Sequence, residues 1–463
     1  MKEMTNSRNL LISRKILQSG IELKVGRKKF FLPYPPSMWK DFPDEYKYSL
    51  ADSLTYFLTM HLALTDDCKV TYDFPCPITE PFFFKGMLYS LSDNFLAKNN
   101  RKSMGEILKL YYNKIYEIEF RGRPRYPRFK NINLNNRNRS IIPFSFGKDS
   151  LLTFGLSREL GIEPSLFFFQ EPKSVFENRH KHKLAKQFKK EFDVEVKEYD
   201  VSVGALREEG TEHEWGWGMS LTQYTMLLIP YLFSMKARYL FWANEQSCND
   251  VFFDKEGYLL SPVYEQTFQW LLTSNDIARL LGSNAIISSL IEPIHEIAVI
   301  KILHSRYPEI AKYQMSCFSE DLEKSARNKR WCGACTKCAR VFILFKALGI
   351  DPEKVDFKEN MLVSGKRHLF GIFAGSDIKK DSGWDQSDVA REEQLFAFYQ
   401  AYKRDVRGPL LEEFKKKYLR EIEKKEKLLR KKYFGVHSQN TLTNVLKEPL
   451  LKIYEEELLP LRK

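Results

Sequence analysis

The sequence predicts an α/β protein whose centre is a parallel β-sheet, preceded by a mixed α+β domain and followed by a helical extension. Apolar strand-like runs alternate with helical patterns between residues 140 and 243, which is the order of a parallel sheet with crossover helices. Short strand-like runs broken by prolines come before this region, and a largely charged helical pattern follows it. Because 463 residues exceed one ordinary domain, we expect domains over 1–135, 136–350 and 351–463.

The first 135 residues contain strand and helix patterns but no motif with a readable chemistry. Ile21–Val25 and Lys28–Leu32 are short apolar runs typical of strands, and prolines follow them. Helical periodicity follows around Tyr46–Leu64 and Leu88–Glu117. The stretch over 120–139 is rich in Arg and Asn and poor in apolar residues, which predicts an exposed linker.

The central region predicts four strands that alternate with three helices. The strand-like runs are Ser140–Phe144, Ser165–Phe169, Val194–Tyr199 and Tyr239–Ala243. The helical runs are Ser150–Leu160, which Gly161 ends, Asn178–Phe192 and Leu221–Lys236. Right-handed crossovers would place the carboxyl ends of these strands at one edge of the sheet, where α/β proteins bind their ligands. Beyond about residue 350 the chain becomes polar, and from Glu392 onward it predicts charged helices.

Composition favours a cytoplasmic protein with anionic partners. Lys and Arg total 73 against 60 for Asp and Glu, so the formal charge is +13, which suits nucleotides or RNA. The basic run Arg121–Lys130 contains aromatic residues and could touch RNA, although a solvated linker explains it equally simply. No apolar stretch reaches membrane-spanning length, and the first residues lack the apolar core of a signal peptide.

A phosphate-binding loop is predicted where the first central strand meets its helix. The segment reads Ser145-Phe-Gly-Lys-Asp-Ser150, and a loop that leaves a strand and enters a helix directs several backbone N–H groups at one point. Gly147 permits a close backbone approach, and the hydroxyls of Ser145 and Ser150 can donate hydrogen bonds. Lys148 supplies positive charge, and Asp149 can cap the helix or bind magnesium.

A cluster of cysteines after the central region predicts a metal site. Three of the seven cysteines lie in Cys332-Gly-Ala-Cys335-Thr-Lys-Cys338, and Cys317 lies upstream. Four thiolates match tetrahedral zinc, and an iron–sulfur cluster is the alternative that cysteine spacing leaves open. With every ligand supplied by the protein, the zinc would be structural and would hold Arg330, Trp331 and Arg340 near the site.

The loop resembles the Ser-Gly-Gly-x-Asp-Ser motif of the PP-loop ATP pyrophosphatases, with Phe146 in place of the first glycine. It does not fit the Walker pattern of kinases and GTPases, because Ile142 stands where the first glycine belongs and Asp149 follows the lysine. The resemblance implies an adenine nucleotide alpha hydrolase-like fold that cleaves Mg²⁺-bound ATP between the α and β phosphates. It also implies that adenine lies near Phe169, Gln170 and Glu171, at the end of the second strand.

Asn244 and Glu245 follow the last of the predicted strands and are further candidates for ATP binding. The resemblance places that strand end at the same edge of the sheet as the loop. Polar residues at strand ends are about as common without such a role.

Two PP-loop families place a comparable cysteine cluster after the loop: 7-cyano-7-deazaguanine synthase and the ATP-dependent epimerase of UDP-N-acetylmuramoyl-alanyl-glutamate. In length, N-terminal domain and C-terminal extension the chain is more similar to the epimerase. The similar segments, besides the loop, are Ala243–Ser247, Ser289–Glu296, Ser316–Cys317 and Arg330–Ala339.

Both families activate a carboxylate, so the resemblance implies adenylation of a small or nucleotide-linked carboxylate. Lys148 and the loop amides would stabilise the departing pyrophosphate. Amidation, ligation to an amine, or loss and return of an α-proton could each follow the adenylation.

His295, Glu296 and Arg330 are candidates for proton transfer or substrate contact, since His titrates near neutral pH and the pKa of Glu can be raised. The simpler interpretation is an amphipathic helix over Ile291–Leu303 with His295 on its flank. A tRNA-modifying PP-loop enzyme and a non-catalytic, zinc-stabilised nucleotide-binding module are the rival classes. The intact Lys148-Asp-Ser150 argues against the second of these.

Overall fold

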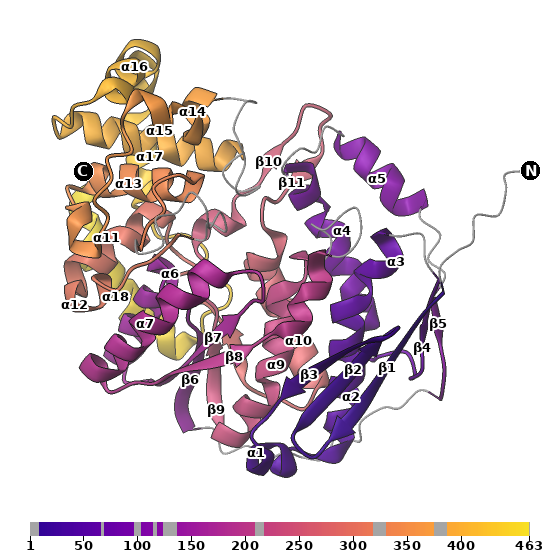
Figure 1. Ribbon diagram of the computed structural model, residues 1–463. Coiled ribbons are helices and arrows are strands. Elements are labelled where there is room, and N and C mark those ends of the chain that lie inside the picture. Colours follow the sequence, from indigo (N-terminus) through magenta and orange to yellow (C-terminus); the bar gives the residue numbers. More distant parts are fainter. Residues whose placement is uncertain are drawn as a thin grey trace, which may run out of the picture.

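The computed structural model describes residues 9–65, 69–96, 103–113, 118–123, 137–208, 217–317, 330–374 and 387–462 (Figure 1). Most of the basic run Arg121–Lys130 lies outside the described residues, so the predicted RNA contact stays a prediction. The described part contains two five-stranded sheets and a two-stranded hairpin, with helices packed around them.

The N-terminal sheet is mixed, with the strand order β3-β2-β1-β4-β5. Its strands are β1 (Asn9–Leu17), β2 (Gly20–Val25), β3 (Lys28–Pro33), β4 (Lys69–Tyr72) and β5 (Ile118–Phe120). The first three strands pair antiparallel, whereas β4 pairs parallel to both β1 and β5. The strands predicted at Ile21–Val25 and Lys28–Leu32 are confirmed as β2 and β3.

Five helices accompany this sheet: α1 (Pro36–Asp41), α2 (Asp44–Thr59), α3 (His61–Thr65), α4 (Glu80–Leu96) and α5 (Met104–Asn113). The helical run predicted over Leu88–Glu117 was wrong in extent, because the chain forms two helices there and then enters β5. The mixed α+β character predicted for this part is confirmed. Its division from the rest at residue 135 stays a prediction.

The central sheet is parallel throughout, with the order β12-β9-β6-β7-β8. Its strands are β6 (Arg137–Pro143), β7 (Glu163–Gln170), β8 (Val196–Asp200), β9 (Ala237–Phe241) and β12 (Ile286–Ser288). The four predicted strands are confirmed, and the short β12 was not predicted. Successive strands run outward from β6 on one side through β7 and β8, and on the other through β9 and β12. The direction of winding therefore switches between β6 and β9, which is where ligands bind in open α/β sheets.

Helices cover both faces of the central sheet. They are α6 (Lys148–Glu159), α7 (Val175–Phe192), α9 (Ser220–Met235), α10 (Phe268–Leu280), α11 (Glu296–Arg306), α12 (Pro308–Ala311) and α13 (Thr336–Leu348), with the short hairpin β10 (Phe252–Phe253) and β11 (Leu259–Leu260) between α9 and α10. As predicted, α6 ends just before Gly161, which has a left-handed φ of 68°. Alternate side chains of β6 divide between the two sides, so Ile142 packs with α6, α7 and α11, and Ile141 with α2, α9 and α10.

The chain after Leu348 is mainly helical, as predicted. Its α-helices are α14 (Gly371–Ala374), α15 (Asp388–Lys403), α16 (Pro409–Lys417), α17 (Leu419–Tyr433) and α18 (Asn444–Arg462). They bury apolar side chains such as Phe398 and Leu450 in the same core as α6, α11 and α13. The N-terminal sheet shares the core on the opposite face of the central sheet.

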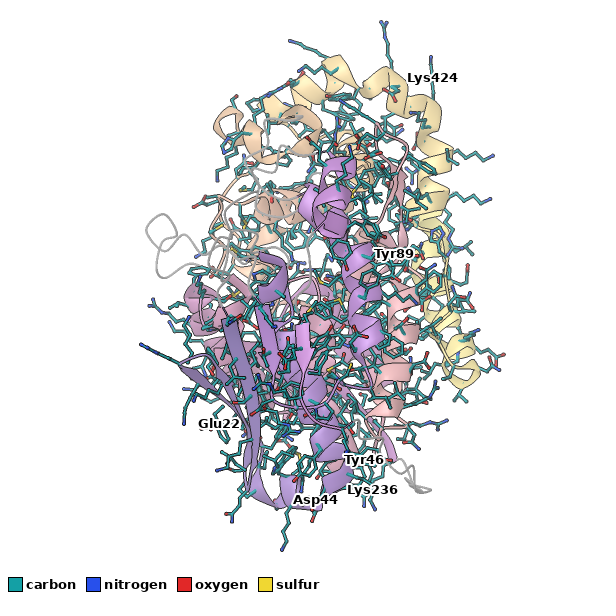
Figure 2. All side chains as sticks on the ribbon, turned by 90° about the vertical axis from the view of Figure 1, so that its right-hand side faces the viewer. Glu22, Asp44, Tyr46, Tyr89, Lys236 and Lys424 are labelled. Atoms are coloured by element: carbon teal, nitrogen blue, oxygen red, sulfur yellow. The ribbon has the colours of Figure 1, made fainter. Side chains whose placement is uncertain are left out.

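The N-terminal part lies on the right of Figure 1 and the C-terminal helices on the left, and Figure 2 shows the molecule from the right-hand side. Asp44, at the start of α2, lies at one end of the view, and Lys424 on α17 lies at the other. Within the described residues, no helix combines the length and the apolar character that crossing a membrane requires.

Candidate functional site

A cavity of about 570 Å³ lies at the carboxyl ends of β6, β7 and β9, where the winding of the sheet switches. Its walls come from the β6–α6 loop (Phe144, Ser145, Asp149, Ser150), the end of β7 and the start of α7 (Phe169, Glu171, Ser174, Asn178), the start of α9 (Trp217, Leu221, Tyr224) and the end of β9 (Trp242, Ala243, Asn244). This volume is typical of pockets for nucleotides and other small molecules.

The loop between β6 and α6 folds tightly at one end of the cavity. Phe146 has a left-handed φ of 56° and a fully buried side chain, which packs against Phe144 and Phe188. The Ser145 backbone N–H donates to Ser150 Oγ at 3.3 Å, and Ser150 Oγ in turn donates to the carbonyl oxygen of Gly147 at 3.2 Å. Phe146 thus has the backbone conformation that glycine adopts most readily, at the position where the resembling motif has glycine.

The first turn of α6 opens beside the cavity without a side-chain cap. The helix begins at Lys148, and the residue before it, Gly147, has no side chain that could accept a hydrogen bond. Ser145, Asp149 and Ser150 line the cavity next to this turn. Uncapped amides at a helix N-terminus favour an anion, which suits the phosphate groups of a nucleotide.

Asn244 adds a buried hydrogen-bond donor to the cavity wall. The residue is 5% exposed, and its side-chain Nδ2 has no hydrogen-bond partner among the described residues. The backbone carbonyl oxygen of Asn244 accepts a hydrogen bond of 2.6 Å from Ser289 Oγ, which holds the chain just after β9. A buried amide nitrogen without a partner is costly unless a ligand accepts its hydrogen bond.

Another part of the cavity wall is aromatic, and a buried ion pair between Arg207 and Glu171 holds it in place. Phe169 and Tyr224 stack with ring centroids 4.2 Å apart. Glu171 Oε1 accepts hydrogen bonds from Arg207 and from the Tyr224 hydroxyl, and the Arg207 guanidinium lies 5.0 Å from the ring centroid of Trp217. The wall therefore offers flat, rigid surfaces on which a base can stack.

Lys148 belongs to a buried group of charges and does not line the cavity. Its Nζ lies 2.6 Å from Asp149 Oδ1, 3.4 Å from Glu245 Oε1 and 3.2 Å from Glu296 Oε1. Burial acts to lower the pKa of Lys148, but these carboxylates raise it well above its usual value. Asp149 connects the group to the cavity, since it contacts both.

The pKa values of the carboxyl groups around Lys148 shift in different directions. Burial raises the pKa of Glu245 well above its usual value, and it raises the pKa of Glu393 to about 8. Burial has the same tendency at Glu296, but Arg340 and Lys148 lower the pKa of that carboxyl. Arg340 Nε lies 3.3 Å from Glu296 Oε2, so Glu296 is the ionised partner of both cations.

Outside the phosphate loop and the cysteines, three predicted site residues belong neither to the cavity wall nor to the buried charges that contact Lys148. Gln170, at the end of β7, donates from Nε2 to Glu198 on β8. Arg330 donates to the carbonyl oxygens of Lys312 and Val355, at 2.7 and 3.3 Å, so it braces the chain around the cysteines. The third is His295.

The side chain of His295 is buried behind the cavity. It immediately precedes α11, which begins at Glu296, so the helix predicted over Ile291–Leu303 starts later than expected. His295 Nε2 lies 3.3 Å from Asp250 Oδ2, and the ring packs against those of Tyr433 and His437. Burial lowers the pKa of His295 despite the nearby carboxylate of Asp250.

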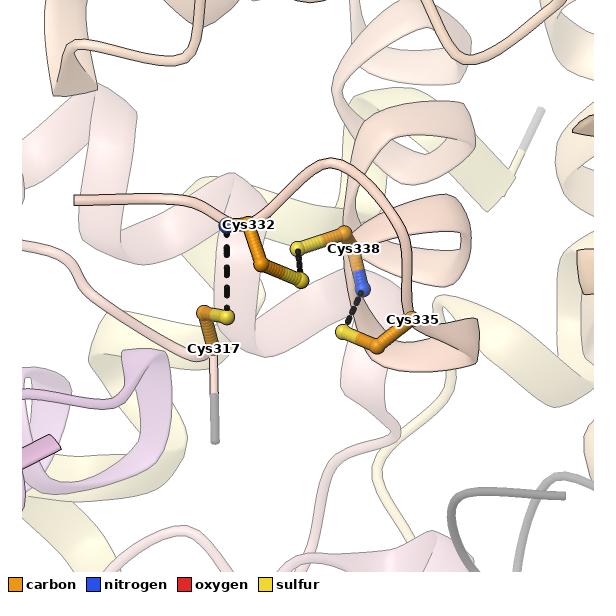
Figure 3. Close-up of side chains that lie close together, drawn as sticks. All are labelled: Cys317, Cys332, Cys335 and Cys338. Carbon is orange, nitrogen blue, oxygen red and sulfur yellow. Dashed lines mark hydrogen bonds between the residues drawn. The ribbon is translucent and has the colours of Figure 1, made fainter. Parts of the chain in front are cut away.

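Four buried cysteines lie close enough together to hold a metal ion (Figure 3). The Sγ atoms of Cys317, Cys332, Cys335 and Cys338 all lie within 4.8 Å of one another, and those of Cys332 and Cys338 are 3.7 Å apart. Tetrahedral zinc with Zn–S bonds of about 2.3 Å would hold its sulfurs about 3.8 Å apart. The donor set fits a metal such as zinc.

Backbone amides complete the surroundings of the sulfurs. The N–H groups of Cys332, Ala334 and Cys338 donate to Cys317 Sγ, Cys332 Sγ and Cys335 Sγ at 3.3 to 3.4 Å. Such N–H···S contacts stabilise thiolates and orient metal ligands.

Arg207 and Tyr224 shape the cavity but were not predicted as site residues. Arg207 lies in a short 3₁₀ helix (Ser202–Glu208) and is fully buried, and no sequence pattern marks a buried arginine. Glu171, which was expected near the ligand with Phe169 and Gln170, lines the cavity at the end of β7.

No protein-family model matches this chain, and no curated protein is detectably similar to it in sequence.

Proposed function

We propose that the protein is an ATP pyrophosphatase that adenylates a carboxylate-bearing small molecule or nucleotide-linked substrate. One observation carries the proposal: the segments that resemble the carboxylate-activating families converge on the phosphate loop. Ser289 Oγ donates to the carbonyl oxygen of Asn244, and the Glu296 N–H donates to Ser247 Oγ at 3.3 Å. Glu245 and Glu296 contact Lys148, which lies within the loop itself.

The residues present fit ATP. The uncapped first turn of α6, with the hydroxyls of Ser145 and Ser150, suits the phosphates. Asn244 Nδ2 has no hydrogen-bond acceptor among the described residues, and a phosphate or ribose oxygen of ATP would supply one. The stacked Phe169 and Tyr224 offer a surface for adenine.

In this proposal an oxygen of the substrate carboxylate attacks the α-phosphorus of ATP. A new O–P bond forms, the bond from the α-phosphorus to the bridging oxygen breaks, and pyrophosphate leaves with the electron pair. Asp149 reaches the cavity and could hold Mg²⁺, which would neutralise phosphate charge. The amides at the start of α6 would stabilise the charge that develops on the leaving group.

The buried position of Lys148 changes the role that we propose for it. Its Nζ is buried among carboxylates, so in this arrangement it orients Asp149 and adds positive potential beneath the loop. Direct contact with the leaving phosphate would require the Lys148 side chain to leave Glu245 and Glu296.

The preferred substrate is a UDP-N-acetylmuramoyl-peptide carboxylate, and 7-carboxy-7-deazaguanine is the alternative. Purified protein would be incubated with ATP, Mg²⁺ and each compound, and the products separated. We expect AMP and pyrophosphate with one of them, whereas ADP and phosphate alone would contradict the mechanism. Asp149→Ala and Ser150→Ala should lower turnover by about 100-fold or more, in line with the loss of an essential positioning or charge-stabilising group.

A control variant should keep the activity. Asp276→Ala removes an exposed carboxylate that pairs with Arg279 on α10. Wild-type turnover in this variant, with unchanged circular dichroism in all three variants, would assign the losses to the loop. Equal losses in Asp276→Ala and Asp149→Ala would contradict that assignment.

A further inference from the structure

The cysteine group touches the phosphate loop from one side through Met315. This residue lies two positions before Cys317, and both side chains are fully buried. The Met315 backbone N–H donates to the carbonyl oxygen of Phe146 at 2.8 Å. The contact therefore holds the left-handed residue on which the shape of the loop depends.

A second connection runs from the other side of the cysteine group. Helix α13 begins immediately after Cys335 and carries Cys338 in its first turn. Arg340, two residues further on, lies 3.3 Å from Glu296, and Glu296 lies 3.2 Å from Lys148 Nζ. The three side chains are 11%, 2% and 4% exposed, so solvent and salt screen this chain of charges weakly.

We propose that the four-cysteine centre positions the phosphate loop, with Arg340 and the Met315 amide as the two links. The inference rests on the proposed function, because it assigns the loop to nucleotide binding. A metal held by all four cysteines would fix Cys317 relative to α13, and so fix both links together. Arg340 is in this sense a positioning residue for Lys148 and the start of α6.

The test compares Arg340→Gln with Arg404→Gln. Arg404 donates from Nε to the carbonyl oxygen of Ala347, at the far end of the same helix, and does not contact Glu296. We expect both variants to retain the zinc content of the wild type. Arg340→Gln should bind ATP about tenfold more weakly, corresponding to about 1.4 kcal/mol, and exchange the amide hydrogens of residues 146–150 faster. Arg404→Gln should match the wild type in both.

Two further measurements distinguish the proposed link from a general packing defect. Arg340→Lys retains the charge and should recover part of the ATP affinity, which a general packing defect would not predict. Removal of zinc from the wild type by a chelator should speed exchange at residues 146–150 as Arg340→Gln does. Unchanged loop exchange after zinc loss would overturn the inference.

Failure of the proposed function and failure of the inference about the cysteine centre would give different results. If the wild type binds no ATP, the proposed function fails, while loop exchange still tests the link to the cysteines. If the wild type binds ATP but Arg340→Gln equals Arg404→Gln in affinity and loop exchange, the proposed function survives and the inference is overturned.

Discussion

Phe146 combines a left-handed backbone with a fully buried aromatic ring. Left-handed φ costs a residue with a Cβ about 1 kcal/mol relative to glycine. Packing against Phe144 and Phe188 offsets that cost, since burying a phenylalanine stabilises a core by several kcal/mol. The side chain thus supports the turn that glycine would adopt by backbone freedom alone.

We predict that Phe146→Gly is more stable than Phe146→Ala by about 1 kcal/mol, because only the alanine retains the left-handed cost. Both should lose about 3 to 5 kcal/mol relative to the wild type through the cavity that they leave. Denaturant unfolding measures the difference.

Phe154 provides the matched control, since it is fully buried in the interior of α6. There Phe154→Ala should be more stable than Phe154→Gly by about 1 kcal/mol, as in ordinary helices. The same order at both positions would contradict the argument from backbone conformation.

Among the secondary-structure elements, helix α18 is connected to the central sheet by hydrogen bonds to the carboxylate of Glu292. Glu292, which follows β12, is 1% exposed. It accepts hydrogen bonds from the backbone N–H groups of Asn440 and Thr441, both at 2.9 Å, and from the hydroxyls of Ser438 and Thr441. These residues form the connection that leads into α18.

We expect Glu292→Ala to lower the free energy of unfolding by about 3 kcal/mol or more, because it leaves buried N–H groups without acceptors. Helix α18 should also become the first site of limited proteolysis. Glu455→Ala is the control, since it removes a half-exposed partner of Arg462 on the surface of α18, and exposed ion pairs contribute about 0 to 1 kcal/mol. Equal effects of the two changes would show that Glu292 has no special role.

At the scale of the whole molecule, α15 brings a buried carboxyl group to the charges beneath the phosphate loop. Glu393 Oε1 accepts a hydrogen bond of 2.9 Å from the Ile297 N–H, and Ser247 Oγ donates to its Oε2 at 3.4 Å. Burial raises the pKa of Glu393 from 4.5 to about 8. The C-terminal helices are therefore coupled electrostatically to the candidate site.

This pKa shift predicts a pH dependence of stability. Between pH 4.5 and about 8, folded Glu393 keeps a proton that the unfolded chain has lost. The contribution of Glu393 to the free energy of unfolding is largest below pH 4.5. It falls by roughly 1 kcal/mol per pH unit up to about pH 8. Glu393→Gln stays neutral, and its Oε1 can accept from the Ile297 N–H while its Nε2 donates to Ser247 Oγ, so its stability should fall less over this range.

Thermal unfolding at pH 5 and pH 8 tests the prediction. The exposed Glu412→Gln should follow the wild type at both values. If Glu393→Gln and the wild type lose the same stability between pH 5 and pH 8, Glu393 is ionised in the folded protein.

Local sequence patterns were enough to predict four of the five parallel strands, the turn into α6, the helical C-terminal part and the four cysteines that lie together. Each follows from short-range rules of periodicity, turn residues and ligand spacing. The strand β12 has too few residues for such rules. The places of β4 and β5 depend on pairing between distant segments, since β4 pairs with β1 and β5 pairs with β4.

The side chains that meet at the loop could not be predicted from local sequence. The direction in which Lys148 turns, the approach of Glu296 and Arg340, and the burial of Arg207 beside Glu171 depend on contacts between residues 36 to 148 positions apart. Local sequence carries no signal for such contacts, because the free energy of a buried charge depends on the partners that the fold supplies.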